Sequence, residues 1–81
     1  MIKIYGSDMC PDCIECKADL NKRNVEFEYA DINESLQNLK DFLLLRDSDP
    51  AFKDITGSGY IGIPAIVTDD KRVLLDWDEI R

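Results

Sequence analysis

Hydrophobic and polar residues follow two alternating patterns along this chain. In some short stretches apolar residues occupy every second position or form a brief unbroken run, and both arrangements predict β-strands. In the longer stretches between them, apolar residues recur three or four positions apart, as on the buried face of an amphipathic helix. The predicted strands cover residues 1–5, 25–30, 65–68 and 72–75. The predicted helices cover residues 10–24 and, after a cap at 33–35, the residues up to about 46, with a short third helix at 48–55.

Residues with special backbone roles mark the starts of these helices. Pro11 falls in the first turn of the first helix, where its missing N–H leaves no hydrogen bond unmade. Ser35 can cap the second helix, and Asp49-Pro50 offers a start for the third. Three glycines then indicate a turn-rich approach to Pro64. The breaks between the predicted elements therefore have local chemical causes.

The order of these elements predicts the architecture. A strand, a helix and a second strand form a βαβ unit, whose strands pair in parallel. The last two strands follow each other closely and form an antiparallel hairpin. The sequence therefore predicts an α/β fold with a four-stranded mixed sheet, helices on its faces and the order βαβ-α-ββ. A single domain spans residues 1–81, with one helical turn at most after the last strand.

Composition narrows the range of partners. The 81 residues include 17 acidic and 10 basic side chains, which gives a net charge of −7. A negative surface repels phosphate backbones and anionic lipids, so we expect neither nucleic acid nor a membrane surface as a partner. The sequence has no apolar run of the roughly 20 residues that a membrane span needs, and its start lacks the pattern of a signal peptide. We therefore expect a cytoplasmic monomer.

The side chains available for chemistry are few, because the chain contains no histidine. This excludes Ser-His-Asp and Cys-His catalysis and zinc sites with histidine ligands. Three cysteines remain, Cys10, Cys13 and Cys16, within seven residues. The disulfide framework of a small secreted protein spreads its cysteines along the chain, so this odd and clustered set indicates free thiols in a reducing compartment.

The most informative segment is Cys10-Pro11-Asp12-Cys13, at the junction of a predicted strand and helix. The first thiol of such a segment faces the unsatisfied N–H groups and the positive dipole end of the helix, which favour the thiolate. Cys10 is therefore the predicted nucleophile and Cys13, one turn later, the predicted resolving thiol. Asp12 and Asp8 oppose thiolate formation and partly offset the helix. A C-x-x-C segment near a βαβ unit is the signature of a thioredoxin-like redox motif.

The sequence resembles the glutaredoxin family of the thioredoxin-like superfamily. The resemblance rests on Cys10-Pro11-Asp12-Cys13, on Tyr29-Ala30-Asp31-Ile32 and on Gly62-Ile63-Pro64, and it extends from residue 1 to about residue 78. It implies a thioredoxin-like fold in which Pro64 follows a cis peptide bond and lies against the active-site cysteines. It also implies that the backbone of Ile63 pairs with the cysteinyl part of glutathione or of a substrate.

The resemblance implies an activity as well. Members of the family are glutathione-dependent thiol–disulfide oxidoreductases that serve electron transport and cell redox homeostasis. The implied partners are glutathione, as co-substrate, and protein disulfides or glutathionylated proteins, and no metal is expected. The predicted catalytic residues are Cys10 and Cys13. The predicted substrate-binding residues are Pro11, Asp12, Tyr60, Ile63, Pro64 and Asp78.

The chain departs from the family pattern where glutathione binds. Asp12 stands where relatives have Tyr or Phe, and the basic residue usual near Ser7 is missing. Leu74-Leu75 replaces the Gly-Gly pair that helps to receive the γ-glutamyl end, and only Asp78 matches the aspartate that follows. The C-terminal helix of the family is truncated. Lys17 and Arg46 are the cations we choose to meet the carboxylates of glutathione.

These departures keep two alternatives open. The first is an electron donor recycled by thioredoxin reductase, which the missing glycines favour. The second is an iron–sulfur cluster-binding module that uses Cys10 as a ligand, with a cluster shared between two subunits. Cys16 lies on the inner stripe of the predicted helix, where we expect it to pack in the core. Tyr60 either flanks a substrate groove or serves as a turn residue.

Overall fold

The computed structural model describes residues 1–79, and its elements follow the predicted order. The four strands are β1 (Ile2–Gly6), β2 (Phe27–Asp31), β3 (Ala65–Val67) and β4 (Val73–Leu74). The two helices are α1 (Pro11–Lys22) and α2 (Leu36–Ser48). Single 3-10 turns follow at Pro50–Phe52 and at Trp77–Glu79. The last two positions of the predicted domain, 80–81, lie outside the described residues.

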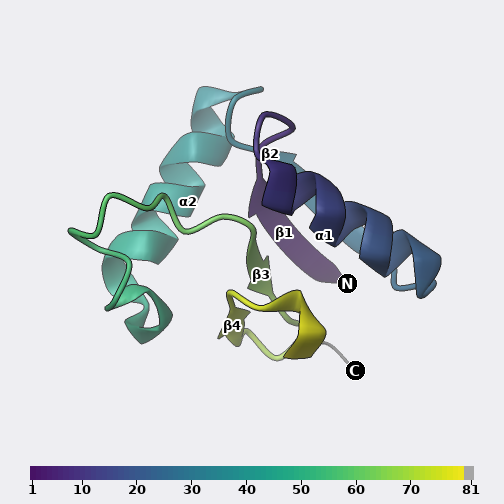
Figure 1. The fold of residues 1–81 in the computed structure, drawn as a ribbon. Coiled ribbons are helices and arrows are strands. Elements are labelled where there is room, and N and C mark those ends of the chain that lie inside the picture. Colours follow the sequence, from purple (N-terminus) through teal and green to yellow (C-terminus); the bar gives the residue numbers. More distant parts are fainter. Residues whose placement is uncertain (80–81) are drawn as a thin grey trace.

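The strands form one mixed sheet in the order β2-β1-β3-β4. β1 pairs in parallel with β2, and α1 makes the crossover between them. β3 pairs antiparallel with both β1 and β4. Figure 1 shows this arrangement, with the loop before β3 and the end of α2 at one side of the sheet. The predicted α/β, thioredoxin-like fold is therefore confirmed.

Three predicted boundaries are wrong, each for a local reason. β2 begins two residues late because Asn24 takes a positive φ of 58° and the Val25 N–H bonds back to the carbonyl of Leu20, which caps the C-terminal end of α1. The third predicted helix is only a 3-10 turn, followed by further turns up to Gly57 with its φ of 84°. β4 pairs over only two residues at the edge of the sheet, where it has a single neighbouring strand.

Each face of the sheet carries one helix and one part of the core. Successive residues of a strand point to opposite faces, so Ile4 packs beneath α1 and Tyr5 beneath α2. The cluster on the α1 face contains Ile4, Cys16, Leu20, Ile66 and Leu74. The cluster on the α2 face contains Tyr5, Ala30, Ile32, Phe42, Phe52 and Ala65. The sheet is therefore the central layer of three.

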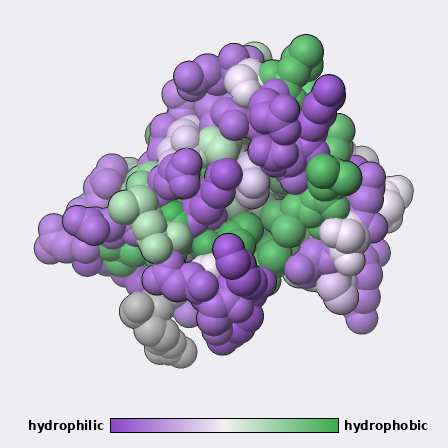
Figure 2. All heavy atoms as spheres, turned by 180° about the vertical axis from the view of Figure 1, so that it is seen from behind, coloured by the Kyte–Doolittle hydropathy of each residue, from purple (hydrophilic) through white to green (hydrophobic). Residues whose placement is uncertain are grey.

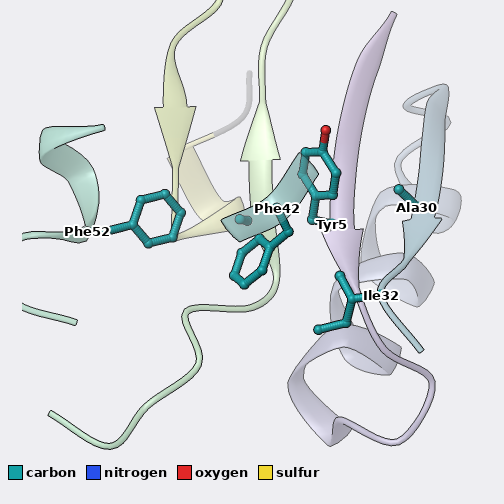
Figure 3. Close-up of a cluster of buried hydrophobic side chains, with 6 residues drawn as sticks. Tyr5, Ala30, Ile32, Phe42 and Phe52 are labelled. Atoms are coloured by element: carbon teal, nitrogen blue, oxygen red, sulfur yellow. The ribbon is translucent and has the colours of Figure 1, made fainter. Parts of the chain in front are cut away.

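The α2 face owes its packing to aromatic rings. Figure 3 shows Phe42 between Tyr5 and Phe52, and the ring centroids are 6.0 Å apart in both pairs. The Phe42 and Phe52 rings meet edge to face at 81°, an arrangement that aromatic pairs prefer. Phe52 comes from the 3-10 turn after α2, so this contact ties the loop that leads to Pro64 onto the core.

The surface is mostly polar but carries several exposed apolar side chains. Figure 2 shows hydrophilic residues around a band of hydrophobic ones on the face opposite that of Figure 1. No helix among residues 1–79 is long and apolar enough to cross a membrane. The exposed large hydrophobic side chains are Met1, Met9, Ile14, Leu36, Leu43, Leu44, Tyr60 and Ile61.

Candidate active site

Cys10 occupies the N-cap of α1. Its backbone is extended, and its Sγ accepts a hydrogen bond from the Cys13 N–H at 3.4 Å. Its own N–H donates to the Ser7 carbonyl at 3.0 Å, and Pro11 begins the helix, as predicted. The Cys10 side chain is half-buried. The sulfur therefore combines partial access to solvent with a backbone donor that stabilises negative charge.

The preceding loop is held in place by Ser7, a buried polar residue. Its hydroxyl accepts a hydrogen bond from the Met9 N–H at 3.1 Å and donates one to the Asn33 side chain in the loop after β2. The Ser7 carbonyl accepts the bond from Cys10. Two loops that lie far apart in the sequence thus fix the position of the Cys10 backbone.

Cys13 and Cys16 are fully buried, and all three cysteines are free thiols. Burial raises the pKa of Cys13 to about 12, and the neighbouring Cys10 and Cys16 act in the same direction. Burial also raises the pKa of Cys16 to about 11, with a further contribution from Asp19. Both thiols are neutral at physiological pH. Cys16 belongs to the α1-face core, as predicted.

The difference in burial between Cys10 and the other two cysteines predicts selective alkylation. At neutral pH the Cys13 thiol is protonated, because burial raises its pKa to about 12. Iodoacetamide added to the reduced protein is expected to modify Cys10 alone, since thiolate and access are both required. Peptide mass spectrometry measures the modified sites. Alkylation in denaturant serves as the control, because there all three cysteines react. Equal labelling of Cys13 and Cys10 in the folded protein would contradict the assigned burial.

A cleft of about 500 Å³ opens beside Cys10. The Ile63–Pro64 peptide bond is cis, as predicted, and both residues border this cleft. Cys10 and Asp12 form one wall, and Tyr60 lies in the loop that forms the other. The complete lining is Met9, Cys10, Asp12, Ile55, Gly59, Tyr60, Ile61, Gly62, Ile63, Pro64 and Leu75. The structure thus gathers residues that lie some 50 positions apart around one half-buried thiol.

The sequence and the fold together identify the family. The family model described as Glutaredoxin matches residues 2–73. The chain belongs to the glutaredoxin family. It is 35% identical over 78 residues to an uncharacterized protein of Haemophilus influenzae, an alignment that covers 96% of this chain and 91% of that protein. No solved structure is significantly similar to it.

Two of the predicted substrate-binding residues of this glutaredoxin, Pro11 and Asp78, do not border the cleft. Asp78 lies in a different groove beside α1, with Lys22 and Trp77, and its N–H bonds to the Asp76 carboxylate in the last 3-10 turn. Pro11 is exposed at the helix start and acts on the site through the backbone of α1. The structure therefore does not bring Asp78 to the place where a ligand of Cys10 would lie.

The cleft carries little positive charge for a glutaredoxin. Asp12 is the charged carboxylate in its lining, and the lining contains no lysine or arginine among the described residues. The two cations chosen from the sequence are engaged elsewhere. Lys17 pairs with Asp8 at 2.6 Å, and Arg46 donates to the Tyr60 carbonyl at 3.0 Å. Arg46 therefore supports the wall of the cleft and does not line it.

Four apolar residues of the cleft lining, Met9, Ile55, Ile61 and Leu75, were not predicted as site residues. Met9 and Ile61 are 83% and 55% exposed. The available signal for these two was a large apolar residue in a predicted loop, directly beside a predicted site residue. Among residues 1–79, no three His, Cys, Asp or Glu side chains form a group that could hold a metal ion.

Proposed function

We propose that this glutaredoxin reduces disulfides by thiol–disulfide exchange, with Cys10 as nucleophile and Cys13 as resolving thiol. One observation supports the proposal most directly. Cys10 borders a cleft beside cis-Pro64, whereas Cys13 is buried and its N–H donates a hydrogen bond to the Cys10 sulfur. A nucleophile must reach its substrate, whereas a resolving thiol needs to reach only its neighbour.

The proposed reaction has two exchanges. The Cys10 thiolate attacks a substrate disulfide, forms a mixed disulfide and releases the first substrate thiolate, which takes up a proton. Cys13 then loses its proton and attacks the Cys10 sulfur. The second substrate thiol leaves, and the Cys10–Cys13 disulfide remains. The substrate disulfide has gained two electrons and the two cysteines have lost them. Ile63 and Pro64 would align the sulfurs along the cleft wall.

Glutathione is the proposed reductant, by analogy with the family. One glutathione thiolate would open the Cys10–Cys13 disulfide to give glutathionylated Cys10, and a second would release it as glutathione disulfide. The proposed substrates are protein disulfides and glutathionylated proteins. The exposed Met9 and Ile61 support contacts with apolar residues of a protein substrate. The proposed setting is the cytoplasm, where thiols stay reduced, and the proposed state is a monomer.

The charge of the cleft favours a second candidate, an electron donor recycled by thioredoxin reductase. Glutathione carries net negative charge, and Asp12 faces the same cleft with no basic side chain in the described lining. Repulsion of this kind lowers the rate of encounter, more strongly at low salt. A reductase delivers electrons without needing a glutathione site on this chain.

A recycling assay tests both candidates. The oxidised protein is mixed with NADPH and either glutathione with glutathione reductase or thioredoxin reductase alone, and NADPH consumption is followed. We expect glutathione to support turnover. We also expect Asp12→Asn to raise the glutathione rate about two- to threefold at low salt, because it removes the repelling charge.

Glu15→Gln is the matched control, because Glu15 is exposed on α1 and lies outside the cleft. It removes the same charge and is expected to leave the glutathione rate unchanged. Turnover with thioredoxin reductase alone would overturn the dependence on glutathione and establish the second candidate. Turnover with neither reductant would overturn the proposed function.

A further inference from the structure

The Tyr29 hydroxyl, from β2, lies beside the resolving cysteine. Glycine at position 6 makes this approach possible: a Cβ added there would lie 2.9 Å from Tyr29 Oη and 3.0 Å from Cys13 Sγ. Both atoms therefore lie close to the backbone of Gly6, in the space that a larger side chain would occupy. The hydroxyl is buried and makes no hydrogen bond of regular geometry, although the Asp8 carboxylate lies close enough to act on it. Such an unpaired buried donor is uncommon in proteins and calls for an explanation.

We propose that the Tyr29 hydroxyl donates a hydrogen bond to the Cys13 sulfur as it becomes a thiolate and attacks the mixed disulfide on Cys10. This inference rests on the proposed dithiol mechanism and assigns a positioning role that the mechanism leaves open. A thiol is a weak acceptor whereas a thiolate is a strong one, so the bond from Tyr29 forms as negative charge develops on Cys13.

The surroundings of Cys13 explain why such a donor is needed. Burial raises the pKa of Cys13, and the neighbouring thiols of Cys10 and Cys16 oppose its ionisation further. The backbone of Ser7 acts in the opposite direction. No carboxylate is among the groups that act on the pKa of Cys13. A hydrogen bond from Tyr29 would stabilise the charged form of Cys13 where water has little access.

The surroundings of Tyr29 keep it a donor. Burial raises its pKa, and the nearby Cys13, Asp8 and Asp31 act in the same direction. The phenol therefore holds its proton throughout the reaction. The Lys17 ammonium lies 3.9 Å from the centre of the Tyr29 ring and is anchored by Asp8 at 2.6 Å. This cation–ring contact helps to hold the Tyr29 ring in place.

The proton and electron balance of the step is simple. The Cys13 thiol loses its proton, which reaches the departing substrate thiolate through solvent. A Cys10–Cys13 sulfur–sulfur bond forms as the bond between Cys10 and the substrate breaks, and the substrate sulfur leaves with the electron pair. Tyr29 gives up no proton and only strengthens its hydrogen bond as charge develops on Cys13.

The test separates the two exchanges with an aromatic disulfide, dithiobis(nitrobenzoate). The reduced protein is expected to release one coloured thiolate when Cys10 attacks and a second when Cys13 attacks, in two kinetic phases. In Tyr29→Phe the first phase is expected to stay unchanged. The second is expected to slow about tenfold at neutral pH, and its pH profile is expected to move to higher pH. Because the hydroxyl makes no hydrogen bond of regular geometry in the resting protein, its loss is expected to leave the fold intact.

Two control variants show which cysteine produces each kinetic phase and whether the effect is specific to Tyr29. Cys13→Ser removes the second phase and so assigns it. Tyr5→Phe removes a hydroxyl from the adjacent strand on the opposite face of the sheet, and both phases are expected to persist unchanged. An unchanged second phase in Tyr29→Phe, or equal slowing of both phases, would overturn the role of Tyr29. The absence of any coloured release from the wild-type protein would instead overturn the proposed function.

Discussion

Replacement of Cys10 by serine is expected to abolish disulfide reduction, with a loss of roughly a thousandfold or more, as for an enzyme that loses its nucleophile. Serine has the shape of cysteine, but its hydroxyl does not ionise at neutral pH. Cys10 is also the half-buried cysteine that borders the cleft. The measurement is the rate of glutathione- or reductase-coupled reduction of a protein disulfide.

Cys13→Ser is expected to behave differently. Its Cys10 thiolate still attacks the substrate, so a stable mixed disulfide accumulates, and turnover continues only where a second glutathione resolves it. Cys16→Ala is the control on the same helix, because Cys16 is buried in the α1-face core and lies outside the cleft lining. It lowers stability without slowing the exchange. Full activity in Cys10→Ser, or loss of the first attack in Cys13→Ser, would contradict the assigned roles.

Phe42→Ala is expected to lower the free energy of unfolding by about 3–5 kcal/mol. The side chain is 1% exposed, and its ring contacts both Tyr5 and Phe52. The loss is comparable with the whole stability of a small domain, so a large unfolded fraction is expected without denaturant. Urea titration followed by far-ultraviolet circular dichroism measures it.

Leu44→Ala is the matched control for Phe42→Ala. Leu44 belongs to the same helix but is 70% exposed, so its truncation removes little buried surface. The expected cost is below about 1 kcal/mol. Equal urea midpoints for the two variants would show that the aromatic cluster on the α2 face is not the main source of stability there.

Much of the fold follows from the periodicity of the sequence. β1 and α1 are predicted to within about two residues, because each carries a regular pattern and a clear boundary signal, Pro11 in the case of α1. The start of β2 is not predictable in this way. The apolar Val25 fits the alternating pattern, but its N–H is taken by the carbonyl of Leu20 after the turn at Asn24. Periodicity measures which side chains are buried and carries no information about backbone pairing.

The residues of the candidate site also differ in how far the sequence alone predicts them. Cys10, Cys13 and Pro64 belong to local motifs, so the sequence locates them directly. Asp78 was selected only by the resemblance to the family, and it lies in another groove, in the short last turn. The approach of both Tyr29 and Cys13 to Gly6 depends on the parallel register that pairs Ile4 with Tyr29, and on the small size of Gly6. Such a contact exists only after the strands have paired.

The position of Trp77 gives this protein a built-in optical probe of one half of its core. It is the single tryptophan of the chain, and it packs against the cluster on the α1 face. Its fluorescence therefore reports the environment on that side of the sheet, while the aromatic cluster on the other side contains no tryptophan. Backbone signals report both helices together. A comparison of the two would show whether the halves of this small domain melt as one cooperative unit or in sequence.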